Sequence, residues 1–270
     1  MPELPEVETS RRGIEPHIIN TQVSRILIRN RSLRWPVSRA VDRNLPGQTI
    51  CSVTRRAKYL LINTENGSII LHLGMSGSVF IVDLDTPAGI HDHVDIDFNS
   101  GKTLRFRDPR RFGSLHWSKQ ALQHKLLKSL GPEPLDNHFG GDYLWVQSRG
   151  RSVSIKQFIM NAKIVVGIGN IYASESLFLA GINPKRAAGR ISRLRYQKLA
   201  IVIKDVLKNA IKAGGTTLRD FHGGNGEPGY FVQQLEVYGR DGEHCRFCNS
   251  IFSTIIQGQR STFYCKQCQT

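Results

Sequence analysis

Residues 59–73, Tyr-Leu-Leu-Ile-Asn-Thr-Glu-Asn-Gly-Ser-Ile-Ile-Leu-His-Leu, set the fold of the first half of the chain. Two apolar runs, at 59–62 and 68–73, flank Glu65-Asn66-Gly67, and a turn of this kind between apolar runs indicates a β-hairpin. Alternating stretches follow at 94–98 and 104–107, with a polar turn between them at 99–102. After an opening helix, we therefore expect several short antiparallel strands that form a β-sandwich.

The second half of the chain has a different pattern, and Gly131-Pro132-Glu133-Pro134 separates the two halves. Short helices are predicted at 155–160 and 171–180. A longer helix is predicted at 194–213, because apolar residues recur there at helical spacing before Gly214-Gly215.

The chain of 270 residues is long enough for two domains, each with its own core. The predicted fold class is α+β. We expect an N-terminal antiparallel β-sandwich domain with flanking helices over 1–130, a hinge at 131–135, a helical domain over 136–235, and a β-hairpin over 236–270, where four of the five cysteines lie.

Four of the five cysteines form two pairs, Cys245-x2-Cys248 and Cys265-x2-Cys268, with sixteen residues between the pairs. This spacing is typical of a zinc site, in which four thiolates form a closed tetrahedral shell. The alternative, two disulfides, suits a secreted protein. We therefore expect one structural Zn²⁺. The remaining cysteine, Cys51, lies in an apolar alternating stretch and is expected to be buried.

The chain is strongly basic, with 37 Lys and Arg against 22 Asp and Glu, a net charge of +15 and a pI near 9.9. Such an excess is typical of proteins that bind polyanions, although a generic basic protein or a membrane-surface binder shares it. No apolar stretch is long enough to cross a membrane. The first residues are acidic and contain two prolines, unlike a signal peptide. We expect a soluble intracellular protein that binds nucleic acid.

The N-terminus, Met1-Pro2-Glu3-Leu4-Pro5-Glu6, indicates covalent chemistry. If Met1 is removed, Pro2 becomes a secondary amine with a pKa of about 7.7–8.0 and can attack a sugar carbon to form an iminium. Glu3 beside it can transfer protons. The alternative is structural: a helix that starts with proline and has acids in its first turn.

Basic and aromatic residues alternate around Asp108-Pro109, and they suggest a surface that contacts nucleic acid: Arg105, Phe106, Arg107, Arg110, Arg111 and Phe112. The alternative is a solvated strand face with core phenylalanines. Met75, in a glycine-flanked turn, is either a second apolar wedge or a core residue.

Three further segments suggest contacts with a ligand. Gly167-Ile168-Gly169-Asn170 can bring the start of a helix close to a phosphate, or can be a plain packing corner. Lys58 is either an exposed lysine at a strand edge or an ammonium near the reaction centre. Arg260, in the hairpin inside the zinc ribbon, is placed to enter a groove.

Together these motifs identify a resemblance. The chain resembles the bacterial formamidopyrimidine-DNA glycosylases, also called 8-oxoguanine DNA glycosylase/AP lyases, over essentially its whole length. The motifs that carry the resemblance are Pro-Glu-Leu-Pro-Glu-Val-Glu at 2–8, Arg-Ala-Lys-Tyr at 56–59, His-Leu-Gly-Met-Ser-Gly at 72–77, Asp-Pro-Arg-Arg-Phe-Gly at 108–113, Gly-Asn-Ile-Tyr-Ala-Ser-Glu at 169–175 and the cysteine ribbon. The related endonuclease VIII group typically has glycine where this chain has Leu4.

The resemblance implies an enzyme that flips out oxidised purines (8-oxoguanine and formamidopyrimidines), removes the base through a Schiff base and nicks the strand by β,δ-elimination. It implies that Pro2 is the nucleophile and Glu3 the general acid. Lys58 would be the proton donor in β-elimination, and Arg260 in δ-elimination. No cofactor beyond structural zinc is implied.

The resemblance also implies DNA contacts. His91, Arg110 and Arg151 match DNA-contacting positions, and Met75, Arg110 and Phe112 match residues that fill the gap left by the extruded base. Lys156, Asn170 and Tyr172 match positions around a phosphate-binding helix–two-turn–helix, and residues 216–229 match a loop that closes over the flipped base. The implied partner is double-stranded DNA with oxidised purines or abasic sites. The implied protein is a monomer in the bacterial cytoplasm, associated with the nucleoid and not with a membrane.

Two other functions share part of this pattern. A non-catalytic DNA-binding protein could use the same ribbon and basic surface, but it would have no use for Pro2, Glu3 and Lys58. A glycosylase of the endonuclease VIII group would prefer oxidised pyrimidines.

Overall fold

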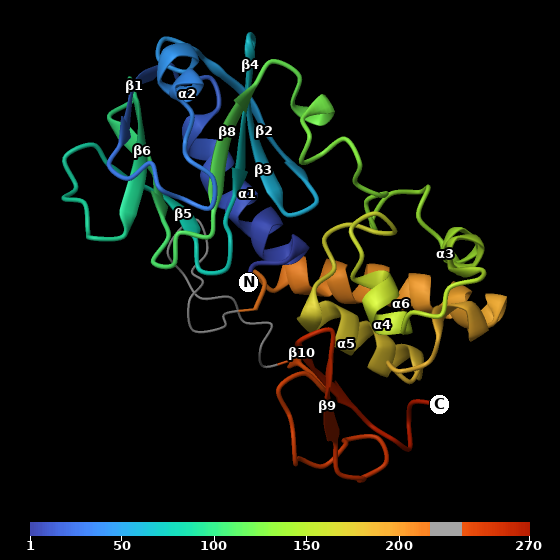
Figure 1. The fold of residues 1–270 in the computed structure, drawn as a ribbon. Helices are drawn as coiled ribbons and strands as arrows, with labels where there is room; N and C mark the ends of the chain where they lie inside the picture. The colour runs from blue at the N-terminus through green and yellow to red at the C-terminus, as the bar shows by residue number, and fades with distance from the viewer. Residues whose placement is uncertain (217–233) are drawn as a thin grey trace. The chain divides into compact units, whose positions relative to one another are not determined.

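The computed structural model describes residues 1–216 and 234–270 (Figure 1). Within the described residues, the chain divides into two compact units, one of residues 1–128 and 213–216 and the other of residues 129–212 and 234–270. The predicted hinge at 131–135, and the boundary between the helical domain and the zinc finger, remain predictions.

The first unit contains two four-stranded antiparallel sheets, ordered β1-β6-β7-β5 and β2-β3-β4-β8. The predicted hairpin is β3–β4, in which Tyr59 pairs with His72 and Thr64 with Gly67. The strands are β1 (Val23–Ile28), β2 (Ile50–Arg56), β3 (Tyr59–Thr64), β4 (Gly67–His72), β5 (Ser78–Asp83), β6 (Asp92–Phe98), β7 (Lys102–Arg107) and β8 (Ser114–Ser118).

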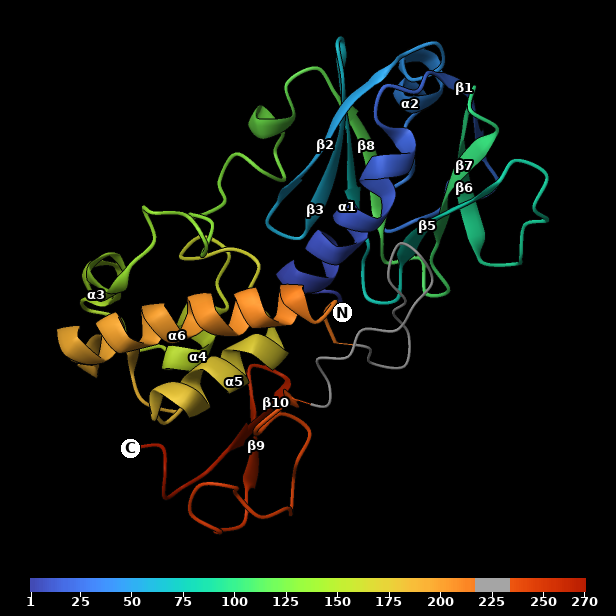
Figure 2. The ribbon, with the colours of Figure 1, turned by 180° about the vertical axis from the view of Figure 1, so that it is seen from behind.

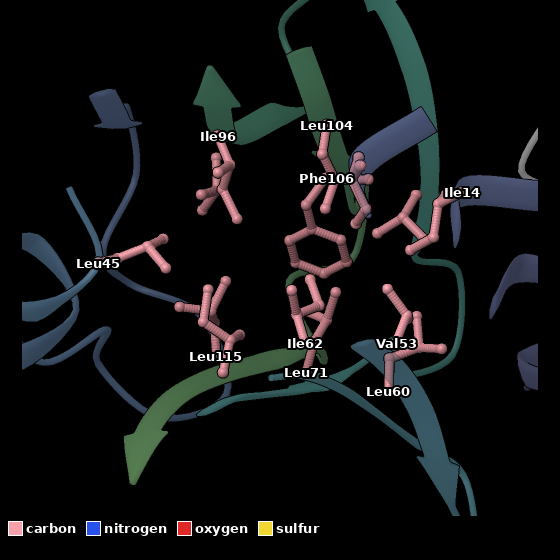
Figure 3. Close-up of a cluster of buried hydrophobic side chains, with 14 of the residues drawn as sticks. Ile14, Leu45, Val53, Leu60, Ile62, Leu71, Ile96, Leu104, Phe106 and Leu115 are labelled. Atoms are coloured by element: carbon pink, nitrogen blue, oxygen red, sulfur yellow. The ribbon is translucent and has the colours of Figure 1, made fainter. Parts of the chain in front are cut away.

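One continuous hydrophobic core lies between the two sheets. Figure 3 shows Phe106 and Leu104 of β7 facing Ile62 of β3 and Leu71 of β4 across this core. Helix α1 (Leu4–Ile18) adds Ile14 to the core and packs along β2 and β5. The unit also contains α2 (Arg39–Asn44) and the short 3-10 helix η1 (Ala121–Gln123). The α+β fold with an antiparallel sandwich is therefore confirmed.

The opposite face of the first sheet carries buried charges. Arg105 of β7, 3% exposed, donates to both carboxylate oxygens of Asp95 at 2.9 Å, and Arg29 of β1 contacts the same carboxylate at 2.6 Å. Arg105 also donates to the carbonyl oxygens of Thr86 and Pro87, at 2.8 and 3.0 Å, and so fixes the loop that leads to β6.

These contacts correct the prediction that Arg105 and Phe106 face nucleic acid. Successive strand residues point to opposite faces, so Phe106 enters the core, where it is 2% exposed, and Arg105 points to the opposite side. There the paired Asp95 and the loop before β6 cover it.

The expectation that Cys51 is buried was wrong, because its side chain is exposed. The pairing of β2 with β3 shifts register between Ile50 and Ser52. Ile50 and Val53 face the core, and the irregularity leaves Cys51 on the solvent side.

The second unit is mainly helical and ends in a hairpin. Its helices α4, α5 and α6 match the predicted ones to within about a residue, whereas α3 was not predicted. The long helix α6 buries its predicted apolar positions, including Leu199, Ile203 and Leu207, and packs against α3 and α5 (Figure 2). No helix among the described residues is long and apolar enough to cross a bilayer. The elements are α3 (Gly141–Ser148), α4 (Ile155–Ile159), α5 (Asn170–Ala180), η2 (Ala188–Arg190), α6 (Arg193–Lys212), β9 (Ser253–Gln257) and β10 (Arg260–Tyr264).

The buried ion pair of Arg105 gives a prediction for stability. Arg105→Met leaves the buried carboxylate of Asp95 without its two-pronged partner and should lower the free energy of unfolding by about 3–5 kcal/mol. Urea denaturation measures the change. The matched control is Lys102→Met on the same strand, because the Lys102–Asp83 pair is exposed (46% and 78%) and should contribute no more than about 1 kcal/mol. Equal losses in the two variants would contradict the assigned role of Arg105.

Candidate functional site

A buried carboxylate, that of Glu6, organises the N-terminal segment. Its Oε2 accepts the backbone N–H of Glu3, the N-cap residue of α1, at 2.9 Å. Its Oε1 accepts the N–H of Thr216 at 2.8 Å and the Thr216 hydroxyl at 2.9 Å. One side chain therefore joins the start of α1 to the described end of the segment that follows α6.

The two residues predicted to carry the covalent chemistry lie together at this helix start. Pro2 and Glu3 are both buried, and Met1 before them is 42% exposed. The fold thus holds the peptide that follows Met1 in a defined place, so an amine generated at Pro2 would be oriented before any substrate binds.

Lys58 lies in the two-residue turn between β2 and β3, where Ala57 adopts a positive φ of 55°. Arg55 donates to the Ala57 carbonyl at 2.9 Å and to the Glu8 carboxylate of α1 at 3.2 Å. The turn that carries Lys58 is thereby tied to the helix that follows Pro2 and Glu3. Burial raises the pKa of Glu8, but hydrogen bonds from Arg11 and Arg12 outweigh it and hold the pKa below its usual value.

A neutral histidine lies near Lys58. Burial, and then the charges of Lys58 and Arg34, lower the pKa of His72 to about 4. Its Nδ1 accepts the N–H of Gly74 at 3.0 Å, which requires an unprotonated nitrogen at that position. His72 therefore stabilises the turn that leads into Met75 without adding a positive charge beside Lys58.

A second buried carboxylate, that of Asp108, joins the predicted DNA-contacting loops. One oxygen accepts the Ser76 hydroxyl at 2.9 Å, and the other accepts the Gly113 N–H at 2.7 Å. The backbone N–H of Asp108 donates to the His91 carbonyl at 3.0 Å. The segments that carry Met75, His91 and residues 110–112 therefore meet at one buried residue.

Three of the predicted contacts are exposed on these joined loops. Met75 is 39% exposed and Phe112 41% exposed, and the guanidinium of Arg110 lies 4.9 Å from the centre of the Phe112 ring. The two turns touch closely, because a Cβ on Gly74 would lie 2.4 Å from the Gly113 nitrogen. Glycine at 74 therefore permits the approach, and its φ of +71° also favours glycine.

In the second unit, the structure brings Lys156, Asn170 and Arg260 to the same hairpin. Arg260 is the first residue of β10, after a turn in which Gly258 and Gln259 both have positive φ. Lys156 is 2% exposed and donates to the Ser261 carbonyl at 3.0 Å, and the Asn170 amide donates to the same carbonyl at 3.0 Å. The structure thus gives Lys156 a structural contact in addition to its predicted role at phosphate.

Two further predicted contacts, Tyr172 and Arg151, belong to the same unit. Tyr172 is in the first turn of α5, but its side chain is fully buried, so a contact with DNA would have to come from the backbone there. Arg151 is exposed in the connection after α3, where its carbonyl accepts the Gly189 N–H at 2.9 Å. Most of the predicted loop at 216–229 lies outside the described residues.

The four ribbon cysteines form a cluster whose sulfur atoms all lie within 4.8 Å of one another: Cys245, Cys248, Cys265 and Cys268. The sulfur atoms of Cys245 and Cys268 are 3.8 Å apart, those of Cys248 and Cys265 are 3.4 Å apart, and none forms a disulfide. Four thiol groups at these separations fit around a single tetrahedral metal ion. The set can therefore hold a metal.

A third buried carboxylate, that of Glu175 on α5, was not assigned a role from the sequence. It accepts the backbone N–H groups of Glu236, Val237 and Tyr238 at 2.8–3.0 Å. Its burial raises its pKa, and these hydrogen bonds oppose the rise. Glu175 therefore fixes the segment that enters the ribbon. The only signal for this role in the sequence is the presence of Glu175 in the motif at 169–175.

Comparisons with known proteins identify two domain families that match this chain. Residues 1–115 match the family model of the formamidopyrimidine-DNA glycosylase N-terminal domain, and residues 130–222 match that of the H2TH domain of the same glycosylase. The formamidopyrimidine-DNA glycosylase of Stutzerimonas stutzeri (strain A1501) is 59% identical over 269 residues, and that of Pseudomonas putida (strain GB-1) is 58% identical. Both alignments cover 100% of each chain.

Solved structures agree with these matches. A Lactococcus lactis FPG mutant in complex with Fapy-dG-containing DNA has a TM-score of 0.92 and 32% identity. The Lactococcus lactis Fpg bound to DNA with an abasic site gives the same TM-score and identity, and each alignment covers 99% of both chains. The class that these findings define is that of the DNA repair glycosylases. Within it, the chain belongs to the formamidopyrimidine-DNA glycosylase family.

The buried His72 gives a prediction for the pH dependence of stability. Because its pKa falls from the ordinary 6.5 to about 4 on folding, the unfolded chain binds the proton more readily. The contribution of neutral His72 to the free energy of unfolding is fully present above about pH 6.5. It is lost as the pH falls towards the pKa of His72 in the folded state. Between about pH 8 and pH 5, the wild type should therefore lose about 2 kcal/mol more than His72→Asn.

Urea denaturation at the two pH values measures this difference. Asparagine keeps an oxygen to accept the Gly74 N–H but cannot titrate. The matched control is the same substitution at an exposed histidine, His17→Asn. Identical pH dependence in the wild type and His72→Asn would refute the assignment.

Proposed function

We propose that this chain is a bifunctional glycosylase and AP lyase that removes oxidised purines from double-stranded DNA and then cuts the strand at the lesion. The proposal combines the full-length family relationship with the residues that the fold positions at the N-terminus. The observation that carries it is the Pro2-Glu3 start, buried at the head of α1 and joined by Glu6 to Thr216.

Base removal begins once Met1 has been cleaved and the damaged nucleotide lies outside the helix. Extrusion costs a few kcal/mol and exposes C1′ to a protein amine. The nitrogen of Pro2 loses its proton and bonds to C1′, and the bond from C1′ to the base breaks with its electrons on the base, which takes up a proton. The C1′–O4′ bond then opens, Glu3 protonates O4′, and the nitrogen lone pair forms an iminium.

Strand cleavage follows from the iminium, which acidifies the neighbouring carbon. Loss of the C2′ proton breaks the bond from C3′ to its phosphate oxygen, with Lys58 as proton donor. A second elimination, with loss of the C4′ proton, breaks the bond from C5′ to its phosphate oxygen, with Arg260 as proton donor. Water then hydrolyses the iminium, which releases the sugar remnant and frees Pro2. Neither an oxidant nor a reductant is needed.

The exposed loops supply the DNA contacts in this proposal. Met75, Arg110 and Phe112 would occupy the space left by the extruded base, and apolar wedges of this kind offset the cost of unstacking. The exposed guanidinium of Arg151 and the first turn of α5 suit phosphate oxygens, and His91 is a further candidate contact on the exposed loops. Lys156, 2% exposed, would support this surface through the Ser261 carbonyl that it holds. The solved Lactococcus lactis proteins are complexes with Fapy-dG and abasic-site DNA, which supports the same classes of substrate here.

Borohydride trapping tests the nucleophile. Reduction should link the protein covalently to an abasic duplex, and peptide mapping should find the DNA on the N-terminal peptide that begins at Pro2. A Gly-Ser extension in front of Met1, which keeps the α-nitrogen of Pro2 in a peptide bond, should abolish trapping and base release because an amide nitrogen is not nucleophilic.

The control for this test carries the same Gly-Ser extension after Thr270, where it should leave trapping unchanged. Intact mass shows whether Met1 is absent from the active sample. If the N-terminally extended protein is trapped as fast as the wild type, Pro2 is not the nucleophile.

The cysteine cluster should hold one zinc ion in a structural role. Cys265→Ser removes one thiolate from a closed set of four, so zinc content should fall from about one ion per chain to well below one. Hydrogen exchange across residues 245–268 should rise, because metal binding is coupled to folding of such ribbons. Cys51→Ser is the matched control, since Cys51 lies outside the cluster and is exposed. Full zinc content in Cys265→Ser would contradict the four-thiolate site.

A further inference from the structure

The buried face of β10 holds Arg260 in place. Alternate residues of a strand point to the same side, so Arg260 and Thr262 lie side by side on one face of β10. Arg260 is exposed, whereas Thr262 is completely buried. The contacts of Thr262 therefore determine how this face, and with it the base of the Arg260 side chain, is oriented.

Thr262 is held by the ammonium group of Lys156. The Lys156 nitrogen donates to the Thr262 hydroxyl at 2.8 Å and to the carbonyl of Ser261 at 3.0 Å. Asn170 donates to that same carbonyl at 3.0 Å. Hydrogen bonds from a charged donor are stronger than neutral ones, and α4 and α5 thus hold two successive residues of β10.

The Thr262 hydroxyl also reaches back towards Arg260. Because its oxygen accepts from the ammonium, its hydrogen remains to donate, and the Arg260 carbonyl lies 3.4 Å away. The side chain of Thr262 therefore links Lys156 on α4 to the backbone of Arg260 itself. Figures 1 and 2 both show β10 beside α5, which carries the second donor, Asn170.

Lys156 and Arg260 border one pocket of 180 Å³. The other residues that line it come from α4, the segment after it, the end of β9 and the β9–β10 turn: Gln157, Met160, Asn161, Gln257 and Gly258. A change in the contact between Lys156 and Thr262 would therefore move Arg260 relative to a pocket that both cations line.

We propose that Thr262 is a positioning residue for the second elimination: its hydroxyl, fixed by Lys156, holds the backbone of Arg260 so that the guanidinium reaches the oxygen that leaves C5′. This inference rests on the proposed function, in which Arg260 serves that step alone. Base release and the first elimination depend on Pro2, Glu3 and Lys58 in the other unit, so loss of the Thr262 hydroxyl should impair the second cut selectively.

The experiment uses the full-length, zinc-loaded protein on an abasic duplex labelled at its 5′ end, so that gel mobility separates the β product from the β,δ product. Thr262→Val removes the hydroxyl and keeps the shape of the side chain. Thr262→Ser keeps the hydroxyl. The matched control is Thr254→Val on β9, where the hydroxyl donates to Asp241 at the surface and does not contact Lys156. Zinc content and thermal stability are measured for every variant.

Thr262→Val should accumulate the β product, with the second elimination slowed by about 10²-fold, the loss that a displacement of about 1 Å causes in a positioned group. Release of 8-oxoguanine and the first elimination should stay within about twofold of the wild type, because the groups proposed to react in them, Pro2, Glu3 and Lys58, belong to the other unit and do not contact Thr262. Thr262→Ser and Thr254→Val should give the wild-type ratio of products. An unchanged ratio in Thr262→Val, or equal slowing of all three steps, would overturn the positioning role.

The variant Arg260→Gln distinguishes failure of the positioning role of Thr262 from failure of the proposed function. If Arg260→Gln leaves the second elimination intact, or if the wild type never cuts the strand, the role of Arg260 fails, and the positioning role fails with it. If Arg260→Gln blocks the second elimination but Thr262→Val does not, only the positioning role fails. Should Thr262→Val lose its zinc, Thr262→Ala replaces it and must show the same shift in products.

Discussion

Buried carboxylates that accept backbone N–H groups hold in place the segments that carry the predicted site residues. Glu6 binds the start of α1 and Thr216, Asp108 binds the loops around Met75 and Phe112, and Glu175 binds the entry to the ribbon. Charged acceptors make stronger hydrogen bonds than neutral ones, and a buried carboxylate must be satisfied to be tolerated. The same requirement therefore orders the N-terminus, the loops that carry Met75 and Phe112, and the segment at 236–238 that enters the ribbon.

Local patterns were sufficient to predict much of the fold. The β3–β4 hairpin follows from apolar runs around Asn66-Gly67, and the long helix follows from apolar spacing that ends at Gly214. The cysteine pairs predicted a metal site because knuckle spacing alone brings four thiol groups together. These features depend on neighbours in the sequence, and for that reason they can be recognised without a structure.

The features that were missed depend on distant partners. Arg105 was assigned to a DNA-contacting surface. In the structure it forms a buried ion pair, because it alternates with Phe106 along its strand and faces the aspartates of β6. The exposure of Cys51 depends on a register shift between two strands. The contact of Lys156 with Thr262 spans 106 residues, so no local pattern could reveal it. The catalytic residues were assigned through the family resemblance, and their spacing alone left structural alternatives open.

The aromatic packing between α5 and the ribbon limits which substitutions this chain can accept. The cysteine cluster shares a small core with Phe178 of α5, whose ring makes edge contacts with Phe247 and Phe252. Helix α5, which lies outside the ribbon, therefore supplies part of the hydrophobic core of the ribbon. A descendant that lost its cysteines would expose an apolar patch on α5, so such a lineage would have to replace Phe178 or supply another cover for it. Loss of the cysteines and change on the helix surface are thus expected to evolve together.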